Sequence, residues 1–122
     1  MRIGVVGGLG TIGKHIVSHF KKTCEVSIIT RANFFGQHPQ YDSLIVSAAD
    51  ARKYLVNQNP VEDLRAVVEL VQGLKKIRYS NLILISTVDV YNQVDNIGDE
   101  ETPLFFKRPS YGDNRLFLEE LV

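Results

Sequence analysis

The sequence predicts an α/β fold built on a mostly parallel β-sheet. Short apolar runs rich in β-branched residues alternate along the chain with segments of helical periodicity, and such runs are typical of strands that are covered on both faces. The first of these runs leads directly into a glycine-rich turn and a helix. At 122 residues, the chain has the length of a single domain with a substantial core.

The glycine-rich turn lies within residues 1–13, which read MRIGVVGGLGTIG. A glycine at position 7 allows a tight turn, one at position 10 lets a pyrophosphate approach the backbone, and one at position 13 lets the helix approach the strand. A helix that begins near Thr11 also supplies unpaired N–H donors and the positive end of its dipole. The stretch therefore predicts a dinucleotide-binding loop, against the alternative of a glycine-rich turn without a ligand. Its candidate contacts are Gly7, Gly10, Thr11, Ile12 and Gly13.

Residues 25–30, EVSIIT, predict a second strand, and the residue that follows it bears on the choice of cofactor. In dinucleotide-binding folds this strand ends near the adenosine ribose, where an acidic residue binds a free 2′-hydroxyl and an arginine accommodates a 2′-phosphate. The chain has Arg31 at this place and no acidic residue, which favours NADP over NAD. A solvated arginine without a ligand is a nearly equal alternative.

The next segment, residues 32–41, is short and contains Gly36 and Pro39, so it predicts an irregular connection without a helix. Its two phenylalanines are expected to close the edge of the core rather than to line an adenine pocket. Residues 42–49, DSLIVSAA, predict a third strand. The small residues at its end, Ala48 and Ala49, would let a cofactor lie against the backbone.

A helix is predicted over residues 59–77, with Asn59 as its N-cap, Pro60 at its first position and Glu62 as the acid of a capping box. Residues 81–86, NLILIS, predict a fourth strand that is covered on both faces. Right-handed crossovers between these elements predict the strand order 3-2-1-4. This is half of a doubly wound, three-layer fold of the Rossmann-like kind.

Hydroxyl groups lie at the C-terminal end of the fourth strand, at Ser86 and Thr87, and a further helix is predicted to start near Tyr111. Tyr111 and Arg115 lie four residues apart and therefore share one face of that helix. A cation beside a phenol lowers the phenol's pKa from about 10, and a nearby threonine hydroxyl could bind the same substrate oxygen. Such groups can move a proton at a substrate hydroxyl during hydride transfer. A tyrosine and an arginine at this spacing are also a common surface pair.

Taken together, these motifs resemble the extended short-chain dehydrogenase/reductases, the NAD(P)-dependent sugar epimerase and dehydratase group. The loop 7–13 is similar to the family's glycine signature, and residues 46–49 occupy the place of its strand that ends in two alanines beside the cofactor. Residues 86–91 resemble its serine- and threonine-rich motif ending in Val-Tyr. Residues 101–103 and 109–112 resemble the stretch that leads into its active-site helix. The resemblance covers essentially the whole chain.

The resemblance implies an NADP(H)-dependent oxidoreductase, epimerase or dehydratase that acts on a hydroxyl or keto group of a small, sugar-like substrate, with NAD as a possible cofactor. It assigns Thr87 as the catalytic hydroxyl, Tyr111 as the acid/base and Arg115 as a third catalytic residue. It places Ser86, Tyr111 and Arg115 beside the cofactor. Arg115 stands where the family has a lysine; it keeps the charge and can reach ribose hydroxyls.

Members of the family continue with a C-terminal substrate-binding region. Residues 1–122 are therefore expected to be the dinucleotide-binding domain, truncated before the later strands. The helices at residues 59–77 and 111–122 correspond to those that pair in the family's dimers, so a homodimer is implied. Two other functions stay open: a non-catalytic dinucleotide-binding module, and an interaction protein that uses these two helices as a dimer face.

Composition excludes several other classes of function. Lys and Arg together number 14, as do Asp and Glu, so the formal net charge of zero argues against a nucleic-acid or anionic-membrane partner. The sequence shows neither a signal peptide nor an apolar run long enough to span a bilayer. A single cysteine, Cys24, is consistent with a reducing cytoplasm. The three histidines have no third-ligand pattern around them and predict no metal site.

Overall fold

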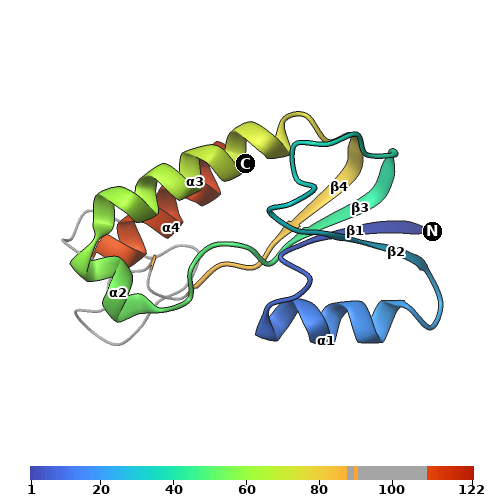
Figure 1. Ribbon diagram of the computed structural model, residues 1–122, viewed down its shortest axis with the longest axis horizontal. Helices are drawn as coiled ribbons and strands as arrows, with labels where there is room; N and C mark the ends of the chain where they lie inside the picture. The colour runs from blue at the N-terminus through green and yellow to red at the C-terminus, as the bar shows by residue number, and fades with distance from the viewer. Residues whose placement is uncertain (88–89, 91–109) are drawn as a thin grey trace. The chain divides into compact units, whose positions relative to one another are not determined.

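A computed structural model describes residues 1–87, 90 and 110–122, and the chain divides into two compact units (Figure 1). Unit 1 comprises Met1–Ala49 with Gln72–Ile85, and unit 2 comprises Asp50–Val71 with Ser86–Val122. The single domain predicted over residues 1–122 stays a prediction. The predicted motif residues 88, 89, 91, 101–103 and 109 lie outside the described part of the chain.

Unit 1 is built on a parallel sheet of four strands, with the order β2-β1-β3-β4. The strands are β1 (Arg2–Val6), β2 (Glu25–Ile29), β3 (Tyr41–Val46) and β4 (Tyr79–Leu84). Each neighbouring pair is parallel, which confirms the predicted α/β fold with a parallel sheet. The strand predicted to run to residue 49 ends at Val46, and β4 begins and ends two residues earlier than predicted.

The predicted strand order 3-2-1-4 is wrong, because β3 pairs with the far side of β1 and not with β2. Gly4 in β1 explains the fit: a Cβ atom there would lie 2.8 Å from Leu44 Cδ1 and 3.1 Å from the Tyr41 ring. The large side chains of β3 therefore use the space that Gly4 leaves open. Leu44 is completely buried, whereas β2 begins with the exposed Glu25 and forms an edge of the sheet. The observed order is that of a doubly wound sheet without the strand beyond β2.

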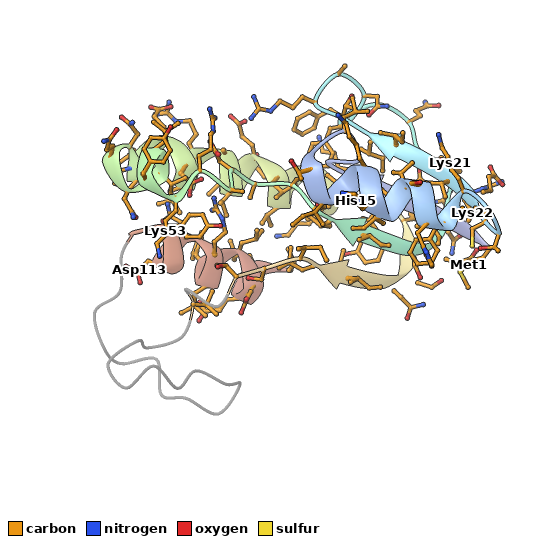
Figure 2. All side chains as sticks on the ribbon, turned by 90° about the horizontal axis from the view of Figure 1, so that it is seen from below. Met1, His15, Lys21, Lys22, Lys53 and Asp113 are labelled. Atoms are coloured by element: carbon orange, nitrogen blue, oxygen red, sulfur yellow. The ribbon has the colours of Figure 1, made fainter. Side chains whose placement is uncertain are left out.

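Helix α1 (Thr11–Phe20) covers one face of this sheet (Figure 1). Its buried Val17 joins Ile3, Val5 and Ile45 in an apolar cluster, because alternate residues of each strand face the same side. Lys21 and Lys22 follow the helix at the end of unit 1 where Met1 lies (Figure 2). The chain then returns to the sheet, where the N–H of Glu25 donates to the Met1 carbonyl at 3.0 Å.

The connection between β2 and β3, residues 30–40, contains no helix, as predicted. Because this crossover runs back across β1, the right-handed rule places it on the sheet face opposite α1. Phe34 is buried in this connection, and a Cβ atom at Gly73 would overlap its ring. Phe34 therefore closes the edge of the core, as expected from the sequence. The same expectation is wrong for Phe35, which is 58% exposed, with the Lys76 ammonium 5.6 Å from its ring centroid.

Strand β4 lies at the other edge of the sheet. The prediction that this strand is covered on both faces is wrong, since Ile83 is 49% exposed and its neighbours alternate between half-buried and exposed. An apolar run suits a central strand and an edge strand equally well, so the sequence pattern does not separate the two positions.

Unit 2 contains α2 (Lys53–Gln58), most of α3 (Pro60–Leu74) and α4 (Ser110–Leu121). The six-residue helix α2 is not predicted by the sequence, and it has no side-chain N-cap. Helix α3 begins at Pro60 as predicted, but the Asn59 amide donates to the Leu55 carbonyl at 3.4 Å, at the end of α2. Glu62 forms an exposed ion pair with Arg65 at 3.3 Å in place of the predicted capping box. Among the described residues, no helix is long and apolar enough to cross a membrane.

Candidate functional site

The glycine loop leaves β1 in a backbone conformation that only glycine adopts readily. Gly7 has φ of +80°, and a Cβ atom there would lie 2.6 Å from the Ser47 carbonyl oxygen. Its N–H donates to the Ile29 carbonyl at 2.9 Å, which ties the loop to the end of β2. The tight turn out of the strand that the sequence predicts at Gly7 is thus observed.

Gly13 holds α1 close to the loop. A Cβ atom on Gly13 would overlap the Gly7 carbonyl oxygen and lie 2.8 Å from Gly8 Cα. Gly10 is the N-cap of α1, with no side-chain cap and no acidic residue in the first helical turn. Within the described residues, a Cβ atom on Gly10 would meet a single neighbour, the Gly7 carbonyl oxygen at 3.3 Å. The N–H groups at the start of α1 therefore have no side-chain acceptor from the cap and can bind an anion.

The end of β3 lies beside the glycine loop. The N–H of Ser47 donates to the Val6 carbonyl at 2.9 Å, and a Cβ atom on Gly7 would lie 3.0 Å from the Ala48 nitrogen. Ala49 follows with φ of 93°, a strained value for a residue other than glycine. Strained backbone of this kind concentrates at functional sites. The structure thus brings the predicted residues Gly7 and Ala48 together.

Arg31 follows the end of β2 in an exposed turn. The N–H of Asn33 donates to the Thr30 carbonyl at 3.2 Å, so Arg31 and Ala32 are the central residues of a β-turn. Arg31 forms no ion pair with the part of the chain that the structure describes. Its guanidinium is therefore available to an anionic group.

The predicted catalytic residues lie in unit 2, and two of them are in contact. Tyr111 and Arg115 are buried on α4, and the Arg115 Cζ atom lies 4.7 Å from the centroid of the Tyr111 ring. The cation therefore stacks on the face of the ring. Thr87 belongs to the same unit and is half-buried; Ser86, beside it, is exposed.

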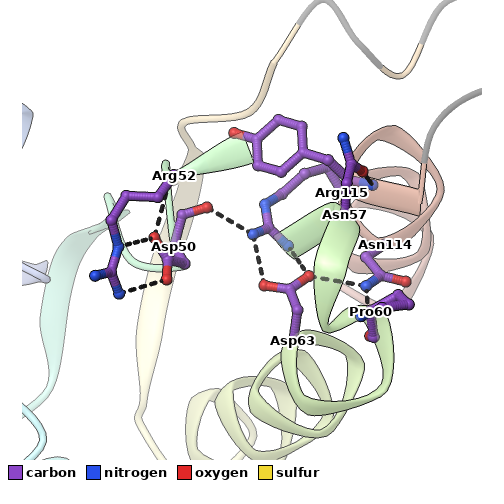
Figure 3. Close-up of polar contacts among 8 residues, drawn as sticks. Asp50, Arg52, Asn57, Pro60, Asp63, Asn114 and Arg115 are labelled. Carbon is purple, nitrogen blue, oxygen red and sulfur yellow. Dashed lines mark hydrogen bonds and ion pairs between the residues drawn. The ribbon is translucent and has the colours of Figure 1, made fainter. Parts of the chain in front are cut away.

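Arg115 donates most of its hydrogen bonds to Asp63 of α3 (Figure 3). Its two terminal nitrogens each lie 2.8 Å from one carboxylate oxygen of Asp63, and one of them also donates to the Asp50 carbonyl at 2.8 Å. The side chains of Arg115 and Asp63 are only 5% and 6% exposed. The positive charge of Arg115 is thus matched by a buried carboxylate that no sequence motif predicts. In the sequence, Asp63 is marked only by its place beside Glu62 in the first turn of α3.

Two asparagines complete the attachment of α4. The Asn114 amide donates to Asp63 Oδ2 at 2.8 Å and to the Pro60 carbonyl at 3.0 Å. The N–H of Tyr111 donates to Asn57 Oδ1 of α2 at 2.8 Å, which satisfies a donor at the start of α4. These contacts join α4 to α2 and α3 in the same region of unit 2 (Figure 3).

The side chain of Asp50 accepts hydrogen bonds from a second arginine, Arg52. Arg52 donates from Nε at 2.9 Å and from a terminal nitrogen at 2.7 Å. These hydrogen bonds hold the pKa of Asp50 below its ordinary value of 3.8, and the positive charges of Arg52 and Arg115 add to the effect. Hydrogen bonds and the negative charge of Asp50 raise the pKa of Arg52 in turn.

Several apolar side chains of unit 2 are exposed on α3 and α4: Val61, Leu64, Val68, Phe117 and Leu121. The homodimer predicted through these helices stays a prediction.

No protein-family model matches the sequence, and no curated protein sequence matches it. Solved structures do match. UDP-glucose 4-epimerase from Bifidobacterium longum, in complex with NAD+ and UDP, is 19% identical with a TM-score of 0.78, over 99% of this chain and 48% of the epimerase chain.

Two further structures extend this likeness. An NAD-dependent NDP-hexosamine 5,6-dehydratase of tunicamycin biosynthesis is 19% identical, with a TM-score of 0.77, over 98% of this chain and 48% of its own. A human epimerase family protein with NADPH is 18% identical, with a TM-score of 0.73, over 99% of this chain and 48% of its own.

The chain has the fold of NAD-dependent sugar epimerases and dehydratases. The resemblance predicted from the sequence is thus confirmed at the level of the fold. The chain spans about half the length of the solved structures that it matches. Their cofactors are NAD in some cases and NADPH in another.

Proposed function

We propose that this chain is the dinucleotide-binding part of an NADP(H)-dependent oxidoreductase, epimerase or dehydratase that acts on a hydroxyl or keto group of a sugar-like substrate. The observation that carries the proposal is the geometry of the glycine loop in unit 1. A side chain at Gly7 would meet the Ser47 backbone just after β3, and one at Gly13 would meet the loop itself. The N-cap of α1 is Gly10, so no side chain caps the first N–H groups of this helix.

The residues of unit 1 fit a dinucleotide in three places. The first turn of α1 offers N–H donors and the positive end of the helix dipole to a pyrophosphate. Ala48 and Ala49 present small side chains at the end of β3, next to the loop. Arg31 offers an unpaired cation at the end of β2, where the adenosine ribose lies in dinucleotide-binding folds. This last feature favours the NADP form of the cofactor.

The chemistry is assigned to unit 2. A bound nicotinamide would accept or donate hydride, and the Tyr111 hydroxyl would move the proton of the substrate hydroxyl. Thr87 would hydrogen-bond the same oxygen. Arg115 contacts the Tyr111 ring face, and its two terminal nitrogens are engaged by Asp63 and the Asp50 carbonyl. It therefore supports the tyrosine through packing and charge rather than as a free donor.

Titration of the protein with NADP+ and NAD+ by calorimetry tests the cofactor site. We expect saturable binding that is tighter for NADP+, and loss of binding in Gly10→Val, whose side chain obstructs the pyrophosphate approach. Absence of binding by both dinucleotides would remove the proposal. Where the wild-type protein turns over a sugar-nucleotide substrate, Tyr111→Phe should abolish that turnover while leaving dinucleotide affinity within about twofold; turnover kept at the wild-type rate would remove the assignment of Tyr111.

A second function, non-catalytic binding of a dinucleotide, is favoured by one observation: the cation at position 115 is buried and paired. Under this alternative, unit 1 binds the cofactor as above, and wild-type protein and Tyr111→Phe show the same absence of turnover. Turnover by the wild-type chain that disappears in Tyr111→Phe would exclude the alternative.

A further inference from the structure

Asn33 is the last residue of the turn that carries Arg31, and its side chain forms hydrogen bonds with the residues that precede Arg31. Asn33 Oδ1 accepts a hydrogen bond from the Thr30 N–H at 2.8 Å, and Asn33 Nδ2 donates to the Ile28 carbonyl at 3.2 Å. The Asn33 N–H also donates to the Thr30 carbonyl at 3.2 Å. One residue thus makes three hydrogen bonds to the end of β2.

The backbone that leads to Arg31 is also tied to the glycine loop. The Ile29 carbonyl, between the two residues that Asn33 contacts, accepts the Gly7 N–H at 2.9 Å. The end of β2 is therefore held by the glycine loop on one side and by Asn33 on the other. Of the two central turn residues, Arg31 and Ala32, only the arginine has a charged side chain.

The simplest alternative is that Asn33 only stabilises the connection between β2 and β3. The connection, however, has a separate anchor in the next residue, because Phe34 is buried against Gly73. Asn33 itself is exposed, and its side-chain bonds run back to β2 rather than forward along the connection. The Asn33 carbonyl does accept the Gly36 N–H at 3.0 Å, but this backbone bond needs no asparagine side chain. The side-chain contacts thus act on the segment that carries Arg31.

We propose that Asn33 is a positioning residue for cofactor selectivity, which holds Arg31 where it can bind a 2′-phosphate. The proposal rests on the proposed function, specifically on the preference for NADP. Restricting the turn before binding reduces the ordering cost that a free arginine loop would incur when the phosphate binds. Asn33 does not need to touch the cofactor for this effect.

The test is a set of dissociation constants for NADP+ and NAD+, measured on the wild-type chain, Asn33→Ala, Arg31→Ala and the double variant. We expect Arg31→Ala to weaken NADP+ binding by about tenfold or more, as for loss of a charge-assisted hydrogen bond, and Asn33→Ala by about three- to tenfold. NAD+ affinity should change less than twofold in each, which also shows that the site is folded. Because Asn33 acts through Arg31, the double variant should be no weaker than Arg31→Ala alone.

Gln37→Ala is the matched control. Gln37 is an exposed amide in the same connection, and it makes no side-chain hydrogen bond within the described residues. We expect wild-type affinities for both dinucleotides. If Asn33→Ala is too unstable to assay, Asn33→Ser takes its place, because it keeps an uncharged oxygen near the Thr30 N–H but loses the donor to the Ile28 carbonyl. The same loss of NADP+ affinity with unchanged NAD+ affinity is expected.

The outcomes separate the two proposals. If Arg31→Ala leaves the NADP+ preference unchanged, the proposed NADP function fails. If Arg31→Ala lowers that preference but Asn33→Ala changes neither affinity, or weakens both dinucleotides equally, the positioning role of Asn33 is overturned.

Discussion

At the residue scale, the glycines of the loop differ in what a side chain would meet. At Gly13, a Cβ atom would overlap backbone atoms of Gly7 and Gly8. Because these are backbone atoms, no change of side-chain rotamer can relieve the overlap. At Gly10, the only close atom in the part of the chain that the structure describes is a carbonyl oxygen at 3.3 Å, so a small displacement accommodates a methyl group. One glycine therefore serves the packing of α1, and the other leaves room for a ligand.

We expect Gly13→Ala to lower the free energy of unfolding by about 2 kcal/mol or more, because the backbone must move to relieve the overlap. Gly10→Ala should cost less than about 1 kcal/mol and still weaken NADP+ binding. Urea denaturation of both variants, with dinucleotide titration of the second, measures these effects. Equal destabilisation by the two alanines would contradict the distinction.

The Asp50–Arg52 pair makes a pH-dependent contribution to stability. The pKa of Asp50 is lowered on folding, mainly by the hydrogen bonds from Arg52. A lowered carboxyl pKa stabilises the fold above the unfolded-state value of about 4, and this stabilisation is lost as pH falls through the folded-state pKa. Because both side chains are substantially exposed, the effect is that of a screened surface pair.

Asp50→Asn should therefore be about 0.5 kcal/mol less stable than the wild type at pH 7. The Asp50 backbone carbonyl, which accepts from Arg115, is kept in this variant. The difference should shrink as pH falls below about 4 and vanish once Asp50 is protonated in both states. Thermal unfolding at a series of pH values measures it, and a difference that grows toward low pH would have the wrong sign.

At the element scale, α4 is attached to α2 and α3 by polar contacts around one buried ion pair. Arg115 and Asp63 come from different helices, and Asn114 donates to the same carboxylate. Such a pair stabilises little relative to apolar residues of similar size, but removal of one partner leaves a buried charge without compensation. The attachment of α4, and of Tyr111 upon it, therefore depends on both residues.

We expect Arg115→Met alone to destabilise the chain by about 3–5 kcal/mol, because Asp63 is left buried and unpaired. Asp63→Leu alone should cost a similar amount, and the double variant should recover most of the loss. A double-mutant cycle by chemical denaturation measures the coupling. Additive losses in the double variant would show that the two side chains do not act as a pair.

At the scale of the whole molecule, the net charge of zero divides unequally between the units. Unit 1 holds eight Lys and Arg residues and two acidic residues, for a formal charge of +6, and the remaining residues in unit 2 carry −6. All three histidines also belong to unit 1. The unit with the glycine loop is thus the one that attracts anions.

Dinucleotide binding should therefore weaken as salt screens this charge. We expect NADP+ affinity to fall several-fold between about 0.05 M and 0.5 M NaCl, and NAD+, which lacks the 2′-phosphate, to fall less. Titrations at fixed pH over this range measure both slopes. Identical slopes for the two dinucleotides would mean that no additional cation meets the 2′-phosphate.

The local pattern of the sequence determined most of the elements and much of the glycine loop. A strand, four closely spaced glycines and a helix start are contiguous within residues 1–13, so their meaning does not depend on distant parts of the chain. The start of α3 at Pro60 and the absence of a helix in residues 30–40 follow from local residues in the same way. Helix α2 was not predicted because it is short and has no cap residue to mark its start.

Tertiary structure alone decided which elements meet. The position of β3 beside β1 depends on the fit of Leu44 and Tyr41 over Gly4, about forty residues away in sequence, and strand patterns are the same for either neighbour. The partner of Arg115 is likewise Asp63, separated by 52 residues. Sequence spacing placed Arg115 on the same helix face as Tyr111, but only the packed structure shows that its charge is held by a carboxylate from another helix.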